Sequence, residues 1–245
     1  MSFFSAKSAF RKFVYTNCAA LAGAGLALYA VDKGYLLTSS LFGRKHSDTI
    51  SSASVDGRAV PNPKIESEIA SLKLVKDLRA DTSNWRELPI TFGIDESSTQ
   101  QSFMHTTFNQ PDHLLAIPKM FVNSDKKQVV FVFYIGKKLC GHPGIMHGGV
   151  QAMLYDEAMA RPALLNLPRN TGFTAYLNIQ YKKPAVVDQL LIMRADLADL
   201  SGRKALVKAS IENVDGVVLS TAESLFVSPS DPTILKDRSD TLGTL

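Results

Sequence analysis

Apolar positions follow a helical spacing in the first part of the folded region. Ile65, Ile69, Leu72, Val75 and Leu78 recur at three- and four-residue steps, which predicts an amphipathic helix over about 64–80. The segment 85–127 shows no clear period and contains three prolines, so we expect short helical turns and loops there. A second helix is predicted over 147–160, and Pro162 should end or bend it just beyond.

A strand pattern dominates the remaining sequence. The β-branched and aromatic run at 129–135 predicts one strand. Four more segments alternate with a period of two: 174–182, 191–197, 205–212 and 217–227. Ser201-Gly202 and Asp215-Gly216 separate the last three and are hairpin signals, so antiparallel neighbours are expected. One helix against one antiparallel sheet is an α+β domain.

Composition excludes several classes of protein. The 245 residues are 45% hydrophobic and 20% charged, which is typical of a globular chain. The net charge of +4 lies wholly within residues 1–60, and the folded region is balanced, so we set nucleic-acid binding aside. Cys18 and Cys140 are too few for a disulfide framework, which favours a reducing compartment. No metal-ligand spacing, Walker loop or dinucleotide fingerprint occurs, so we expect no metal and no cofactor.

The N-terminus has the pattern of a targeting segment. Residues 1–12 carry three basic side chains and no acid, as in mitochondrial targeting sequences. Residues 13–31 carry no charge and, as a helix, would be about 28 Å long, close to the thickness of a bilayer core. Three interpretations remain: a span that anchors the protein in a mitochondrial membrane, a cleaved presequence, and a secretory signal, which the cysteine content disfavours. We therefore expect a targeting and transmembrane segment at 1–38 and a flexible linker at 39–63.

The candidate chemistry surrounds the start of the second helix. The segment 141–150 reads Gly-His-Pro-Gly-Ile-Met-His-Gly-Gly-Val, and the first N–H groups of a helix can polarise a carbonyl or stabilise an oxyanion. Asp156 shares a helix face with small apolar residues, where a carboxylate is costly unless it is hydrogen-bonded or used, and where burial would raise its pKa. Glu157 precedes Arg161 by four positions, which predicts a solvated ion pair.

These motifs resemble the hotdog-fold acyl-CoA thioesterases of the PaaI-like thioesterase superfamily. In that family a His-Gly-Gly opens the central helix and a catalytic Asp or Glu follows nine positions after the His, as Asp156 follows His147. Thr174 resembles the Ser or Thr that assists from the next strand, and Tyr181-Lys182-Lys183-Pro184 resembles the family's continuation. The resemblance covers roughly 128–228. Gly141 departs from the pattern, because some members have an Asn there that helps to hold the thioester carbonyl.

The resemblance implies a sheet wrapped around the central helix, in a protein that dimerises edge to edge. The Gly148 N–H of one subunit would polarise the carbonyl of an acyl-CoA thioester. Asp156 of the other subunit would act as general base on water, or as a nucleophile through an anhydride, and Thr174 would orient the water or the carboxylate. His147 would cap or brace the helix start, and His142 could take the place of the missing Asn or be a structural loop residue.

The resemblance also suggests how the rest of the chain takes part. Residues 64–127 would extend the hotdog domain at 128–228, and 229–245 would form a tail. Side chains expected to bind substrate are His147, Gly149, Gln180, Lys182 and Lys183, the lysines through the phosphates of coenzyme A, for which Arg203 and Lys204 are further candidates. Two alternatives stay open: a catalytically inactive hotdog protein that binds acyl-CoA or a protein partner, and a hotdog dehydratase.

Overall fold

The computed structural model describes residues 54–55, 58–59, 61–94, 96–99, 101–243 and 245. The predicted membrane segment at 13–31 and most of the expected linker lie outside these residues. Among the described residues, no helix combines the length and apolar character that crossing a bilayer requires.

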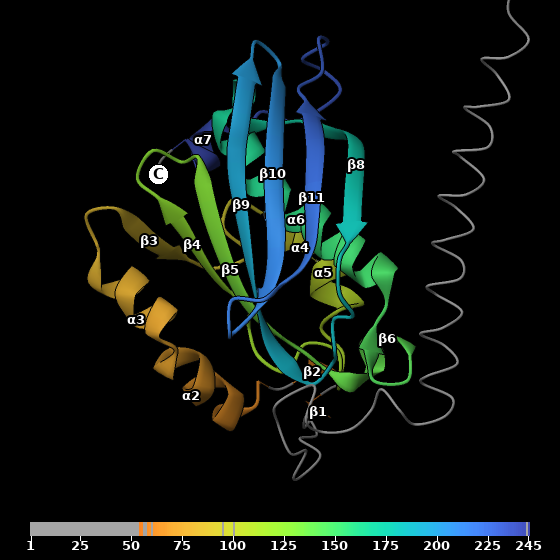
Figure 1. Ribbon diagram of the computed structural model, residues 1–245. Coiled ribbons are helices and arrows are strands. Elements are labelled where there is room, and N and C mark those ends of the chain that lie inside the picture. Colours follow the sequence, from red (N-terminus) through yellow and green to blue (C-terminus); the bar gives the residue numbers. More distant parts are fainter. Residues whose placement is uncertain (1–53, 56–57, 60, 95, 100, 244) are drawn as a thin grey trace, which may run out of the picture. The chain divides into compact units, whose positions relative to one another are not determined.

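A seven-stranded antiparallel sheet is the main element (Figure 1). Its spatial order is β3-β4-β5-β9-β10-β11-β8. The strands are β3 (Trp85–Leu88), β4 (Lys119–Asn123), β5 (Gln128–Ile135), β8 (Phe173–Tyr181), β9 (Gln189–Ser201), β10 (Lys204–Asn213) and β11 (Val218–Val227). Two small ladders pair β1 (Ser54–Val55) with β2 (Arg58–Ala59), and β6 (Cys140–His142) with β7 (Ile145–Met146). The five strands expected from the sequence are confirmed, and β3 and β4 widen the sheet on one side.

The strand connections explain why β8 lies at an edge. Gly202 and Gly216 adopt φ values of 56° and 78° in the tight turns that join β9 to β10 and β10 to β11. The segment 182–188 instead carries the chain away from β8, so that β9 pairs with β5 and β8 pairs with β11. Strand β8 therefore has one paired side and ends the sheet.

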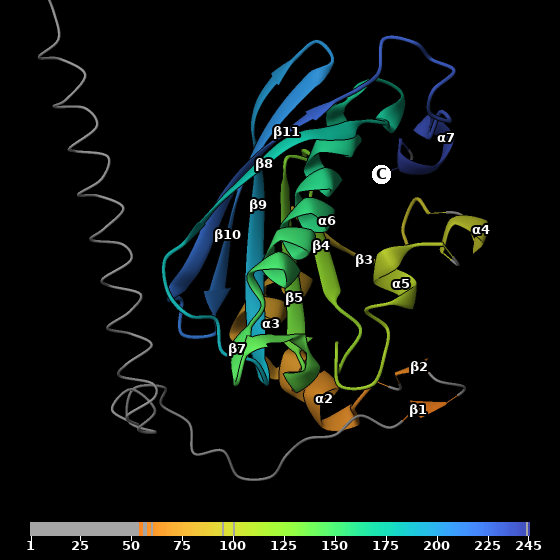
Figure 2. The same cartoon turned by 90° about the vertical axis from the view of Figure 1, so that its right-hand side faces the viewer.

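Helix α6 (Gly148–Asn166) packs along the concave side of the sheet, which curves around it (Figure 2). Of the two outcomes predicted for Pro162, an end or a bend of the helix, the end is wrong, because the helix continues through Asn166. Pro162 is buried and lacks an N–H for the preceding turn. The amide of Asn166 donates to the carbonyls of Pro162 and Lys126, both at 2.8 Å, and so ties the last turn to the β4–β5 connection.

Two helices cover the opposite face of the sheet, where a single helix was predicted. They are α2 (Pro63–Ser71) and α3 (Lys73–Ala80), and they break at Leu72, whose φ of −56° and ψ of 133° are not helical. Their buried residues are the predicted apolar ones, Ile65, Ile69, Val75 and Leu78. These pack in one cluster with residues of β4, β5 and β9, so this part of the sheet is covered on both sides.

The segment 85–127 contains the short helices that were expected, α4 (Glu96–Thr99) and α5 (Phe103–Thr106), in addition to strands β3 and β4. Single helical turns elsewhere are η1 (Lys137–Leu139), η2 (Pro168–Asn170) and α7 (Ser239–Leu242). Strand β4 was missed because its apolar run is short and follows a proline-containing stretch.

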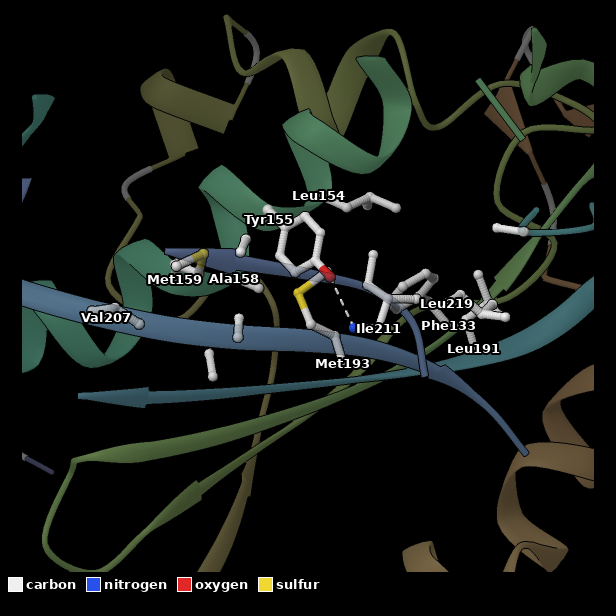
Figure 3. Close-up of a cluster of buried hydrophobic side chains, with 14 of the residues drawn as sticks. Phe133, Leu154, Tyr155, Ala158, Met159, Leu191, Met193, Val207, Ile211 and Leu219 are labelled. Atoms are coloured by element: carbon white, nitrogen blue, oxygen red, sulfur yellow. Dashed lines mark hydrogen bonds between the residues drawn. The ribbon is translucent and has the colours of Figure 1, made fainter. Parts of the chain in front are cut away.

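A chain of buried hydrogen bonds joins α6 to the sheet, and Figure 3 shows the one between Tyr155 and Ile211. The N–H of Ile211 donates to the Tyr155 hydroxyl at 2.9 Å, which lies 2.9 Å from Ser220 Oγ. Ser220 donates in turn to Gln151 Oε1 at 2.8 Å. Burial raises the pKa of Tyr155 to about 12, so the hydroxyl stays protonated and can donate to Ser220. The network fixes the turn of α6 that also carries Asp156.

Candidate active site

His147 caps the start of α6, as the sequence predicted. Its backbone is extended, with φ −63° and ψ 133°, and its Nδ1 accepts a hydrogen bond from the Gly149 N–H at 2.8 Å. His147 and Gly149, both expected to bind substrate, therefore bond to each other in this structure. The N–H of Gly148 occupies the first helical position, where a helix offers no internal acceptor.

Close packing explains the glycines around this cap. A Cβ on Gly148 would lie 3.3 Å from both Cζ and Oη of Tyr181, whose hydroxyl donates to the Gly148 carbonyl at 2.8 Å. A Cβ on Gly149 would lie 3.0 Å from Nδ1 of His147. Gly141 packs against the other side of that ring, where a Cβ would lie 3.0 Å from Cδ2. An Asn at this position would crowd His147, and Gly141 instead gives the ring room to cap the helix.

The carboxylate of Asp156 is held by Thr174. Thr174 Oγ1 donates to Asp156 Oδ1 at 2.7 Å, and the aspartate is half-buried. A β-bulge makes this contact possible: Tyr176 pairs with Leu225 and Thr174 with Phe226, so β8 has one extra residue between them. Phe226 belongs to the buried core beside α6, and the bulge turns Thr174 to that same side.

The bulge also corrects one expectation about β8. Strict alternation along 174–182 predicts that Gln180 shares a strand face with Thr174, since the two are six positions apart, and this prediction is wrong. Gln180 lines a shallow polar groove of about 430 Å³ on the outer face of the sheet, together with Asn178, Thr221 and Glu223. The side chains between the bulge and the end of β8 keep their alternation. The side chains before the bulge point to the face opposite to the one that this alternation predicts.

Glu157 does not form the solvated ion pair that was predicted. It lines a cavity of about 40 Å³ with Arg161 and His105. Burial raises the pKa of Glu157 despite the nearby guanidinium. Arg161 donates to the carbonyls of Ile90 at 2.9 Å and Phe92 at 3.2 Å, and burial lowers its pKa. The four-residue spacing identified Glu157 and Arg161 as neighbours, but it did not reveal the segment around Ile90 and Phe92 that covers them.

Lys182 and Lys183 follow directly after β8 and are exposed. Both backbone N–H groups donate to the Leu219 carbonyl at 2.9 Å, which fixes where their side chains emerge. Since Tyr181 is bonded to Gly148, the two lysines leave the strand at the end nearest the helix start. His142 is exposed on the β6–β7 hairpin. Among the described residues, no group of three or more His, Cys, Asp or Glu side chains could hold a metal ion.

Gly148 and Asp156 lie at opposite ends of one stretch of α6. Eight residues at 1.5 Å per residue separate them by about 12 Å, too far for both to contact one carbonyl group. The contact between Tyr181 and Gly148, which the sequence did not reveal, marks one end of β8, and the contact between Thr174 and Asp156 marks the other. One end of the edge strand thus lies at the helix start with Gly148, and the other end lies at Asp156, so the two groups expected to act together are at opposite ends.

Several known proteins are similar to this chain in sequence. The model of the thioesterase superfamily matches residues 143–220. The acyl-coenzyme A thioesterase THEM4 of Mus musculus is 27% identical over 189 residues, which cover 69% of this chain and 80% of that protein. The uncharacterized mitochondrial membrane protein FMP10 of Saccharomyces cerevisiae is 28% identical over 120 residues, covering 42% of this chain and 48% of that protein. A Streptococcus pneumoniae thioesterase protein solved with coenzyme A matches with a TM-score of 0.39 at 20% identity, over 41% of this chain and 80% of that one.

The matched segment contains the capped helix start, Asp156 and Thr174. It includes the helix and several strands of the antiparallel sheet that curves around this helix, the arrangement of a hotdog fold. The thioesterase superfamily is thus the family that the sequence of residues 143–220 matches.

Proposed function

We propose that this thioesterase-superfamily protein hydrolyses acyl-CoA thioesters to a free acid and coenzyme A, with Asp156 as the catalytic carboxylate. The observation that carries the proposal is the hydrogen bond from Thr174 to Asp156. It leaves the second carboxylate oxygen available for a water molecule and fixes the direction in which that oxygen points. The acyl-CoA thioesterase activity in the name of the mouse relative agrees with this substrate class.

A complete site requires two copies of the chain. Strand β8 ends the sheet, and Thr174 and Tyr181 lie near its two ends. If two β8 strands pair antiparallel, the Thr174 end of one lies beside the Tyr181 end of the other. The Gly148 N–H of one protomer then approaches the Asp156 of its partner, which a single protomer holds about 12 Å away. The apolar side chains exposed along this edge, Phe173, Tyr176 and Tyr181, would be covered by the pairing.

The reaction proceeds by addition and elimination. The Gly148 N–H binds the thioester oxygen, where negative charge develops, and the helix dipole adds to its effect. Asp156 accepts a proton from water as the water oxygen bonds to the carbonyl carbon. The tetrahedral intermediate then breaks its carbon–sulfur bond, and the protonated Asp156 returns the proton to the leaving thiolate. Direct attack by Asp156, giving an anhydride that water hydrolyses, uses the same groups.

Lys182 and Lys183 would bind the phosphates of coenzyme A. They are exposed cations at the helix-start end of β8, so the leaving group would run outward from Gly148 along them. His147 and Gly149 would act through the helix cap. Gln180 lies on the outer face of the sheet. It would contact substrate only if part of a substrate bound at the edge strand of the partner subunit extended over that face.

The protein is proposed to act in mitochondria, anchored to a membrane by residues 13–31. The acid-free basic start of the chain and the uncharged stretch after it support this location. The yeast relative described as a mitochondrial membrane protein supports it as well. Carbonate extraction of isolated mitochondria tests the anchor: the full chain should stay with the membrane pellet, and its release into the supernatant would contradict the span.

The activity is tested by thiol release from a panel of acyl-CoA esters. Asp156→Asn should lower kcat by about 10²–10⁴-fold, the usual contribution of a positioned base. Thr174→Ala should lower it by about tenfold, through loss of one hydrogen bond to a charged group. Asp199→Asn, a matched change at an exposed position, should keep wild-type turnover. Full activity in Asp156→Asn would remove Asp156 from the mechanism, and binding of acyl-CoA without release would favour the inactive alternative.

The two-protomer site is tested by complementation. Asp156→Asn and Gly148→Val each inactivate both sites of a homodimer, but a mixed dimer regains one intact site. Random mixing should restore about a quarter of wild-type activity, because half the dimers are mixed and each has one of its two sites. No recovery in mixtures that demonstrably exchange subunits would contradict the shared site.

A further inference from the structure

Tyr181 contacts the first residue of α6 from the last position of β8. It pairs with Ser220 of β11, and directly opposite residues of antiparallel strands point to the same face of a sheet. Ser220 bonds to side chains of α6, so Tyr181 points to the helix side as well. The N–H groups of the next two residues both donate to the Leu219 carbonyl and fix the end of the strand. Strand pairing therefore places the phenol ring beside the helix start.

Hydrogen bonds at the helix start hold two consecutive peptide groups. In the group between Gly148 and Gly149, the carbonyl accepts from the Tyr181 hydroxyl and the N–H donates to His147 Nδ1, both at 2.8 Å. In the preceding group, between His147 and Gly148, the carbonyl accepts from two N–H groups of the first helical turn, at 3.0 and 3.2 Å. The remaining polar group of the two is the Gly148 N–H, which has no hydrogen-bond partner in the part of the chain that the structure describes. Three bonded groups thus frame the one that stays open.

The direction of the Gly148 N–H depends on how these two peptide groups are held. Each peptide group is a rigid plane, and the two planes meet at the Gly148 α-carbon. Glycine rotates about its backbone bonds more freely than other residues, and helix ends fray readily. The Tyr181 hydroxyl holds the second plane at its carbonyl, and the ring packs so closely that a Cβ on Gly148 would lie 3.3 Å from both Cζ and Oη. Tyr181 therefore restricts the rotation that would redirect the open N–H.

Accurate direction matters for the reaction proposed above. An N–H stabilises a tetrahedral intermediate only if it points at the position that the oxyanion will occupy, and removing such a donor costs about 10²–10³ in kcat. Hydrogen bonds weaken steeply as their angle falls below about 120°. An N–H that samples several directions therefore loses part of its effect, even though it remains at the site.

We propose that Tyr181 is a positioning residue of the hydrolytic site: its hydroxyl, bonded to the Gly148 carbonyl, keeps the Gly148 N–H aimed at the thioester oxygen. The inference rests on the proposed thioesterase function and adds to it the side chain that orients the oxyanion donor. Tyr181 acts through Gly148 and need not touch the substrate.

The kinetic test compares two tyrosines of the same strand. Tyr181→Phe removes the hydroxyl and keeps the ring, so kcat should fall about five- to tenfold, the effect of one neutral hydrogen bond. KM for acyl-CoA should stay nearly constant, because the aimed N–H acts on charge that develops in the transition state. Tyr176→Phe is the matched control, since its hydroxyl donates to Glu223, and it should keep wild-type kcat. An unchanged kcat in Tyr181→Phe, or a change in KM alone, would overturn the proposal.

A double-mutant cycle tests whether Tyr181 acts through Gly148. The Cβ of Gly148→Ala would crowd the phenol ring and disturb its hydrogen bond. Adding Tyr181→Phe to Gly148→Ala should therefore lower kcat by less than about twofold, because the two changes remove the same interaction. Losses that multiply in full would mean that the hydroxyl acts elsewhere, for example on the substrate, and would contradict a positioning role.

The orientation of the Gly148 N–H can also be read without turnover. The chain contains a single His-Gly pair, so protein labelled with ¹³C-carbonyl histidine and ¹⁵N-glycine gives one amide cross-peak, from Gly148. Tyr181→Phe should shift and broaden this peak, and Tyr176→Phe should leave it unchanged. An unchanged peak in Tyr181→Phe would refute the positioning role. Failure of the proposed function is distinct: wild-type protein would then release no thiol from acyl-CoA, while the peak would still report whether Tyr181 orients Gly148.

Discussion

The buried hydroxyl of Tyr155 offers a quantitative test of how α6 is held to the sheet. The change Tyr155→Phe removes one oxygen and preserves the ring, which is fully buried. The β10–β11 register shifts between Ile211 and Glu212, and the Ile211 N–H donates to the Tyr155 oxygen at 2.9 Å. In the variant this N–H would stay buried without an acceptor.

The expected loss follows from that one group. An unsatisfied buried donor costs about 1–3 kcal/mol. Ser220 keeps its hydrogen bond to Gln151, so it adds little. The free energy of unfolding should fall by about 2 kcal/mol, which lowers Tm by about 4–8 °C for a domain of this size.

Urea unfolding measures this loss, with fluorescence of Trp85, the single tryptophan, as the signal. Tyr176→Phe is the matched control, because its hydroxyl donates to Glu223 at the surface, and its effect should stay below about 0.5 kcal/mol. A loss for Tyr155→Phe no larger than that of Tyr176→Phe would refute the account of a network that fixes α6.

Three further results are expected. Burial raises the pKa of Glu157, so its carboxyl lowers the stability of the fold progressively as pH rises above the unfolded pKa of the group. Glu157→Gln should therefore stabilise the protein at pH 7.5 and have little effect near pH 4. Equal effects at the two pH values in urea titrations would contradict the burial. Gly148→Ala should lower kcat while circular dichroism stays native, since its Cβ crowds Tyr181 at 3.3 Å; unchanged kcat would show that the helix start is not used. Replacing Lys182 and Lys183 by Ala should raise KM for acyl-CoA severalfold but not for an acyl-pantetheine, and an equal effect on both substrates would exclude phosphate binding.

The chain's local patterns determined most of the hotdog domain. Alternation of period two located the strands from β8 to β11, and the glycine turns made them antiparallel, because both signals depend only on neighbouring residues. The His-Gly-Gly start and Asp156 were also readable, since a cap and a helix position are fixed by short spacings. The breaks were less predictable: Leu72 interrupts a continuous apolar stripe, and α6 passes through Pro162.

Long-range packing decided what those spacings could not. The bulge that turns Thr174 toward Asp156, and moves Gln180 to the other face, arises where β8 meets β11, strands separated by two others in the sequence. Glu157 became part of a cavity because the covering segment, some seventy residues earlier, is fastened to Arg161. A sequence records which side chains follow one another along a helix or strand. Only the tertiary structure decides which distant segment removes them from water, and that burial sets their charge, their partners and their chemistry.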